Sequence, residues 1–306
     1  LRGDFFCLPF GGNDEVYRGR KHPVHGETAN RNWEMLGMER SGDRTALKLA
    51  MNLEAFRGRV EKNITLMKGH PAVYQEHVIR GVGAPTSLGH HATLRFPDRP
   101  GAGLVSMSKC VHAQVFVRPT EDPAAGGYCL LKPGAIIEDM RRVPTITGGF
   151  ADLSRFPARR GYTDIAIFCA DSALDVAWSA VAFPGEGYAW FSLRNPRVLS
   201  STLLWMSNGG RYYPPWNGRH FNTMGVEDIT GFFHSGAAES AAPNCLSRRG
   251  IATSLAPTAD RPVSVRYIMG LVAIPRRFGA VKSIRAGCGT VTLAGNGGLK
   301  ATARID

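Results

Sequence analysis

The sequence predicts an all-β fold, a large two-sheet antiparallel β-sandwich formed by a single domain over residues 1–306. Segments with alternating or β-branched residues recur along the chain, and most have the length of a strand. Clusters rich in glycine and proline separate them, and the 36 glycines and 19 prolines supply the many turns that such a fold needs. Short antiparallel strands of this kind bury their apolar faces best as two packed sheets.

The predicted strands are spread over most of the chain. They span 45–51, 60–67, 72–79, 112–117, 165–169, 174–183, 188–193, 201–206, 263–274, 281–286, 290–293 and 299–305. Two stretches, 32–40 and 237–240, have a brief helical character, although neither keeps a 3.6-residue apolar period over three turns. No fixed repeat, heptad seam or linker divides the chain, so we expect one domain.

The composition is that of a globular protein, with 43% hydrophobic and 20% charged residues. The 37 Lys and Arg residues outnumber the 25 Asp and Glu residues, and the net charge of +12 favours an anionic partner. These cations are scattered singly and in pairs rather than gathered in a stripe, which argues against nucleic acid. No apolar run reaches membrane-spanning length, no signal segment opens the chain, and the six cysteines are widely scattered. We therefore expect a cytoplasmic protein that does not bind membranes.

Three segments carry residues suited to chemistry, and the first lies at the start of the chain. Residues 1–12 combine an Arg-Gly pair at Arg2 with an apolar strand that ends in Pro-Phe-Gly. A His-Gly pair follows at His25, and Trp33 lies beyond it.

The second segment, residues 87–96, runs into a strand with two adjacent histidines, His90 and His91. Neighbouring residues of a strand face opposite sides of a sheet. Only one of the two histidines can therefore point into a cleft, and we expect the other to be structural.

The third segment follows the predicted strand 201–206 and is dense in aromatic and amide side chains, among them Trp205, Asn208 and Trp216. A carboxylate, Glu227, comes after a Gly-Val pair. Sugars present apolar C–H faces edged by hydroxyls, so their sites combine aromatic surfaces with a few polar groups. The segment is typical of a carbohydrate site.

Taken in this order, the three segments resemble the aldose 1-epimerase (galactose mutarotase) superfamily, which includes the hexose-phosphate mutarotases. The resemblance spans Arg2 to Gly231 and implies a galactose mutarotase-like supersandwich that interconverts sugar anomers. It implies that His91 is the general acid, because residues 92–94 then fall where the family has its short strand, and that Glu227 is the general base. The sugar-binding residues expected from it and from the aromatic segment are Arg2, His25, Trp205, Asn208 and Trp216.

The implied reaction removes the proton from the anomeric hydroxyl and protonates the ring oxygen, so it needs a base and an acid but no metal, redox cofactor or covalent intermediate. We expect a nearby carboxylate to keep His91 protonated by raising its pKa. The family also uses a mid-chain aspartate for substrate hydroxyls, and Asp152 and Asp164 are both candidates.

The sequence departs from the family in two respects. Relatives that bind sugar phosphates usually place an arginine a few residues after His-Gly, whereas Arg31 lies six residues beyond His25. The positive net charge nevertheless favours a phosphate or carboxylate on the sugar, with Arg31, Arg211 and Arg219 as candidate contacts. In the family several strands precede the Arg-Gly pair, so we expect the natural N-terminus to contain strands that this sequence lacks.

Two other classes of function remain open at this point. A metal-dependent β-barrel enzyme would use nitrogen and oxygen ligands drawn from His22, His25, His90, His91 and Glu227. Against it, two histidines three residues apart across a proline are poorly placed to share one face of a strand. A binding protein or sensor would keep the sugar cleft without catalysis, but it would not need both an acid and a base.

Overall fold

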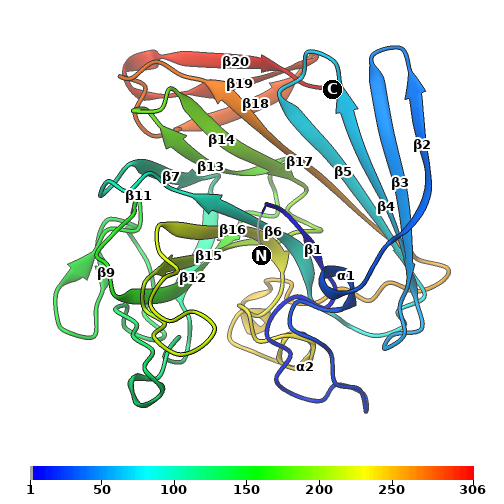
Figure 1. Cartoon of the computed structure of the whole chain (residues 1–306), viewed down its shortest axis with the longest axis horizontal. Helices are drawn as coiled ribbons and strands as arrows, with labels where there is room; N and C mark the ends of the chain where they lie inside the picture. Colours follow the sequence, from blue (N-terminus) through cyan, green and yellow to red (C-terminus); the bar gives the residue numbers. More distant parts are fainter. Residues whose placement is uncertain (1–2) are drawn as a thin grey trace.

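The structure is a computed structural model that describes residues 3–306 as an almost entirely β protein. A six-stranded sheet and a nine-stranded sheet pack against each other, and a three-stranded sheet covers part of the outer face of the nine-stranded one (Figure 1). Every pairing between named strands in this range is antiparallel. The predicted antiparallel sandwich is confirmed, with a smaller third sheet added to it.

The strands follow a different order in space than along the chain. The six-stranded sheet has the order β1 (Phe6–Cys7), β6 (Leu88–Arg95), β16 (Thr223–Thr230), β15 (Ser201–Asn208), β12 (Tyr162–Ala170) and β8 (Cys110–Val115). The nine-stranded sheet has the order β11 (Arg155–Phe156), β7 (Gly103–Met107), β13 (Ala177–Phe183), β14 (Tyr188–Arg194), β17 (Val263–Ala273), β5 (Ala72–Arg80), β4 (Arg59–Met67), β3 (Arg44–Asn52) and β2 (Glu34–Ser41). The small sheets are β18 (Ser283–Gly287), β19 (Thr290–Ala294) and β20 (Lys300–Arg304), and the pair β9 (Val143–Pro144) and β10 (Phe150–Ala151).

Helices are few and short. The α-helices are α1 (Glu27–Asn30) and α2 (Ala237–Ala241), and the 3-10 helices are η1 (Pro123–Ala125), η2 (Ser247–Arg249) and η3 (Asn296–Gly298). Within residues 3–306, neither α-helix has the length and apolar character that crossing a membrane requires.

Most predicted strands are present, but the helical character predicted for 32–40 is wrong. Residues Glu34–Ser41 form β2, the last strand of the nine-stranded sheet, which pairs with β3. Its apolar side chains Met35, Leu36 and Met38 are exposed because the strand lies at the rim of the sheet instead of over the core. Pairing with β3 outweighs the local pattern, as is common for strands. The stretch 237–240 is helical, as α2, and strands β7, β9, β10, β11 and β16 were not predicted.

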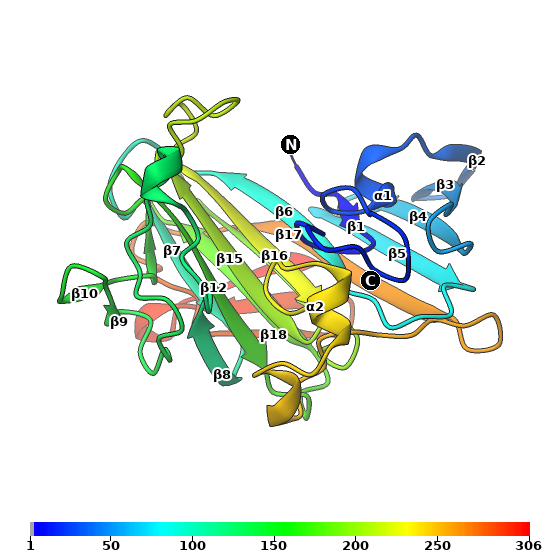
Figure 2. The same cartoon turned by 90° about the horizontal axis from the view of Figure 1, so that it is seen from below.

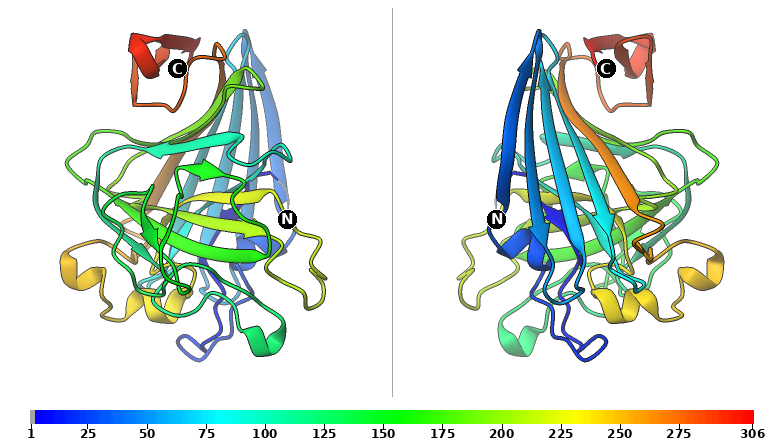
Figure 3. Two further views of the ribbon diagram at one scale, coloured as in Figure 1. Left: turned by 90° about the vertical axis from the view of Figure 1, so that its left-hand side faces the viewer. Right: turned by 90° about the vertical axis from the view of Figure 1, so that its right-hand side faces the viewer.

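The core between the two large sheets takes alternate residues from each strand. Leu204, Met206 and Val226 point inward from the six-stranded sheet and meet Val181 and Trp190 of the nine-stranded sheet. A second apolar cluster joins the three-stranded sheet to the far side of β13 and β14, where that sheet stands beside the wall of long strands in Figure 3. Removing this apolar surface from water is the main stabilising contribution to the fold.

The opposite face of the six-stranded sheet is covered by loops and by α2, as Figure 2 shows. Ile165 and Leu203 point to this outer face and pack with Phe10 and Phe233 from the covering loops. Because strand residues alternate between faces, the neighbours of the inward Leu204 and Val226 also point outward. The outer face therefore receives the side chains that the sequence marked as functional.

Candidate functional site

A cavity of about 200 Å³ opens on the outer face of the six-stranded sheet. Ile165 and Leu203 form an apolar part of its lining. Five of the predicted site residues also line it, although they come from loops and strands far apart in the sequence: His25, His91, Trp205, Trp216 and Glu227.

His91 and Glu227 lie directly opposite each other on the neighbouring strands β6 and β16. His91 Nε2 is 3.2 Å from Glu227 Oε1, and both residues are 2% exposed. The Thr93 hydroxyl lies 3.2 Å from His91 Nδ1, and the Phe5 ring stacks on the imidazole. A Cβ at Gly225 would be 2.2 Å from Glu227 Oε1, so the glycine makes room for the carboxyl group.

Burial sets the protonation of this pair. It raises the pKa of Glu227 well above its ordinary value, and together with the nearby His25 it lowers the pKa of His91 well below the usual range. Both shifts favour a pair that holds one proton, on the carboxyl group, and carries no net charge. The expectation that a carboxylate keeps His91 protonated is wrong here, because the desolvation of two buried groups outweighs their attraction.

His90 faces the other way, into the interior between the two large sheets. Its Nδ1 lies 2.9 Å from Asp4 Oδ2, its ring stacks on Tyr267, and it is fully buried. Gln75 donates a second hydrogen bond to the same Asp4 oxygen. Alternation along β6 thus separates a cavity histidine from an interior histidine, as the sequence predicted.

Replacing His90 by Asn should lower the free energy of unfolding by about 1–3 kcal/mol, because the shorter side chain leaves the buried Asp4 carboxylate short of a partner. Urea unfolding followed by fluorescence measures the change. His70→Asn is the matched control, since His70 lies partly buried beside Tyr74 and outside this cluster. Equal stability of the His90 variant and the wild-type protein would contradict the structural role.

The loop before α1 places His25 in the cavity. His25 has a φ of 61° and Gly26 a φ of 76°, and a Cβ at residue 26 would lie 2.0 Å from the Leu8 carbonyl oxygen. Only glycine permits this close approach, which explains the His-Gly pair. The His25 ring lies edge-on to His91 with 4.9 Å between centroids, and burial lowers the pKa of His25 to about 4.

A buried amide ties together three loops around the cavity. Asn13 Nδ2 donates to the carbonyl oxygens of Pro9, Gly11 and Pro23, and Asn13 Oδ1 accepts from the Ala237 N–H. These loops carry His25 and His234, both of which line the cavity. One side chain thus joins the N-terminal loops to the start of α2.

Aromatic side chains form another wall. Trp205 extends from β15, and Trp216 lies in the following loop, with 6.0 Å between their ring centroids. The Arg211 guanidinium lies 5.6 Å from the Trp205 centroid and 4.9 Å from that of Trp216. Its Nε donates to Glu121 Oε1 at 2.6 Å, while the Tyr213 hydroxyl donates to Glu121 Oε2 at 2.8 Å. Arg211 is therefore fixed by the buried Glu121 while it lines the cavity.

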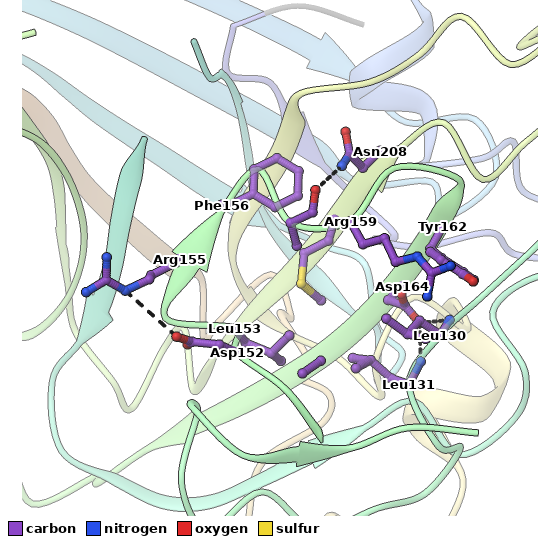
Figure 4. Close-up of a pocket in the computed structure, with 13 residues that line it drawn as sticks. Leu130, Leu131, Asp152, Leu153, Arg155, Phe156, Arg159, Tyr162, Asp164 and Asn208 are labelled. Carbon is purple, nitrogen blue, oxygen red and sulfur yellow. Dashed lines mark hydrogen bonds and ion pairs between the residues drawn. The ribbon is translucent and has the colours of Figure 1, made fainter. Parts of the chain in front are cut away.

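The prediction that Asn208 lies at this site is wrong. Its amide donates to the Ala158 carbonyl oxygen and accepts from the Asn222 N–H, and it lines a separate cavity shown in Figure 4. Asn208 is three residues beyond Trp205 on β15, so the two side chains face opposite sides of the sheet.

Neither mid-chain aspartate lines the cavity of His91. Asp152 and Asp164 both line the separate cavity of Figure 4. Asp164 Oδ1 accepts hydrogen bonds from the Leu130 and Leu131 N–H groups, and burial raises the pKa of Asp164 to about 6. Both candidates for a substrate contact are thus withdrawn.

Of the predicted arginines that the structure describes, one lines the cavity and two do not. Arg2 lies outside the residues that the structure describes. Arg31 pairs with Glu27 and Glu54, and Arg219 is exposed, so neither lines the cavity. Arg211 lines the cavity. His234 also lines it, although no pattern in the sequence marked it as a site residue.

The five residues proposed as metal ligands do not form one site, although His25, His91 and Glu227 line the same cavity. Among residues 3–306, no group of three or more His, Cys, Asp and Glu side chains is arranged to hold a metal ion. His22 stacks on Phe56 and does not line the cavity that His25 enters.

Solved structures of the same fold are numerous. A candidate aldose 1-epimerase from Escherichia coli K12 has a TM-score of 0.57 and 15% identity, and the match covers 89% of this chain and 84% of that one. A galactose mutarotase related enzyme from Lactobacillus acidophilus gives 0.53 and 11%, covering 89% and 83%. A galactose mutarotase-like protein from Clostridium acetobutylicum gives 0.55 and 10%, covering 89% and 80%.

No protein-family model matches the chain, and no curated protein matches it in sequence. The structural likeness thus defines the class of fold: the chain has the fold of aldose 1-epimerases and galactose mutarotase-like proteins. The predicted resemblance is confirmed at that level.

Proposed function

We propose that the protein binds an aldose in this cavity and interconverts its anomers, as an aldose 1-epimerase does. One observation carries the proposal: a buried carboxyl group and an imidazole lie 3.2 Å apart in the lining of a cavity that also contains two tryptophans. The fold shared with aldose 1-epimerases and mutarotase-like proteins supports it.

The cavity suits a sugar ring. Trp205 and Trp216 offer apolar faces to the C–H groups of a pyranose, and His25 and His234 offer ring nitrogens to its polar groups. The tryptophan wall adjoins the His91 and Glu227 pair, since the Trp205 ring lies 6.0 Å from that of His91. A sugar packed on this wall places its anomeric carbon beside the pair.

Ring opening moves one proton from the anomeric hydroxyl to the ring oxygen. The hydroxyl oxygen and the ring oxygen are both bonded to the anomeric carbon and therefore lie close together. An acid and a base in contact with each other can thus protonate the ring oxygen and deprotonate the hydroxyl. Hydrogen bonds from sugar hydroxyls favour the charged carboxylate, which transfers the proton of the pair to His91. Glu227 then takes the anomeric proton as base, His91 protonates the ring oxygen as acid, and the roles reverse when the ring closes.

The direct test is anomer exchange across a panel of free aldoses, measured by NMR magnetisation transfer, with calorimetry for binding. We expect exchange of at least one aldose to rise well above its rate in buffer. A sugar that binds without faster exchange would instead favour the non-catalytic binding protein.

The rate should be nearly independent of pH between about 5 and 8. The active pair contains one proton, and a pair with none or two cannot exchange one in both directions. Because burial lowers the pKa of His91 and raises that of Glu227, the second proton is gained only in more acid solution and the first is lost only in more alkaline solution. A profile of kcat/KM that titrates near 6.5, the ordinary value for histidine, would contradict this account.

A further inference from the structure

One side of the cavity is lined by hydrogen-bond donors. His25, His234 and Arg211 belong to the same lining, and both Arg211 and His25 act electrostatically on His234. They come from the loop before α1, the loop after β16 and the loop after β15, so the fold brings together three segments that are distant in sequence. Proposed catalysis by the His91 and Glu227 pair does not use His234 or Arg211.

The two imidazoles line the cavity, and the surroundings of their Nδ1 atoms indicate which nitrogen carries the hydrogen. Nδ1 of His25 and Nδ1 of His234 are shut off from solvent and have no hydrogen-bond partner among the described residues. A buried N–H without an acceptor is rarer in proteins than a buried acceptor without a donor, which favours the tautomer with hydrogen on Nε2 in each ring. Burial lowers the pKa of each to about 4, so at neutral pH both rings are uncharged and offer one donor apiece.

The third group, Arg211, can donate hydrogen bonds to a ligand from its two terminal nitrogens. Its Nε is occupied by Glu121, which leaves the two terminal nitrogens, and an arginine can only donate. A sugar hydroxyl donates as well as accepts, so among these three groups its own hydrogen would find no acceptor. A carboxylate accepts only, and its planar shape matches the guanidinium fork.

We propose that the preferred substrate is a sugar that bears a carboxylate, held by Arg211 and the imidazoles of His25 and His234; this inference rests on the proposed function. A singly charged carboxylate fits better than a phosphate dianion. Glu121 already balances the charge of Arg211, and no other arginine or lysine among residues 3–306 lines the cavity. Each negative charge of a ligand is therefore buried without a further cation, so a dianion costs more than a monoanion.

The experiment compares matched substrates on the full chain: glucose with glucuronate, galactose with galacturonate, and glucose 6-phosphate as the phosphate arm. Anomer exchange gives kcat/KM, and calorimetry gives Kd. For the wild-type protein we expect a preference of about 10- to 100-fold for the uronate, the range that hydrogen bonds to a charged group supply. Arg211→Met should remove most of this ratio, and Arg211→Lys should keep part of it.

Arg219→Met is the matched control, because Arg219 is an exposed arginine of the same loop and should leave the ratio at its wild-type value. Equal loss of both kcat/KM values in Arg211→Met would show that Arg211 only supports the tryptophans, and would overturn the inference. Preference for the neutral sugar would overturn it while anomer exchange still stands, and preference for the phosphate would overturn the carboxylate assignment. Tighter binding of uronate without exchange would support the anion site and contradict the catalytic proposal alone.

Discussion

Replacing Glu227 by Gln should slow anomer exchange by about 10²- to 10⁴-fold while sugar affinity changes little, the range usual for general acid–base assistance. Glutamine keeps the size and much of the hydrogen-bonding shape of the carboxyl group, but it cannot exchange a proton at neutral pH. Glu227 is 2% exposed, so water has little access to the position that the carboxyl group occupies. Exchange by NMR and binding by calorimetry separate the two effects.

The same variant should fold normally. Burial keeps the pKa of Glu227 high, so the protein already accommodates an uncharged group there, and glutamine imitates it. His91→Asn should slow exchange to a similar extent, whereas Glu186→Gln, a surface change beside Arg99, is the control that should not. Exchange at the wild-type rate in Glu227→Gln would remove Glu227 as the base and favour the binding protein without catalysis.

Much of the fold could be predicted because strands leave a local signature. In β15, Leu203 and Trp205 point to the outer face while Leu204 and Met206 enter the core, and these four consecutive apolar residues indicate a strand that is covered on both faces. The alternation of strand residues between faces separated the neighbouring histidines of β6. Strand β2 was not recognised, because at the rim of the sheet its apolar side chains have no buried face to define a period.

The candidate site could be predicted only in part, because its remaining members depend on contacts between distant loops. His234 lies in the loop before α2. That loop is held to the N-terminal segment by the hydrogen bond from Ala237 to Asn13, two residues that are 224 positions apart in the sequence. Asn208 was assigned by its place in an aromatic segment, without regard to the face on which its strand position falls. The protonation of His91 depends on burial, which the sequence does not give.

The residue next to Glu227 on β16 serves the interior of the sandwich. Asp228 is fully buried, and its Oδ1 lies 2.6 Å from Arg194 Nη1, an ion pair between the two large sheets. Its Oδ1 also accepts from the Thr202 hydroxyl at 2.8 Å, and its Oδ2 accepts from Ser192 at 2.5 Å and from Tyr267 at 3.2 Å. The carboxylate is thus satisfied by groups from both sheets, which offsets the cost of burying its charge.

Replacing Asp228 by Ala should lower the free energy of unfolding by about 3–5 kcal/mol, because it leaves the Arg194 guanidinium buried without its counter-ion. Urea unfolding measures the loss, and Asp171→Ala is the control, since its pair with Lys109 lies at the surface and contributes little. Replacing both partners, Arg194→Met with Asp228→Leu, should cost less than the sum of the two single changes, since neither charge is then left alone. A loss in Asp228→Ala no larger than that of the surface control would mean that the hydroxyl groups around Arg194, rather than Asp228, satisfy the guanidinium.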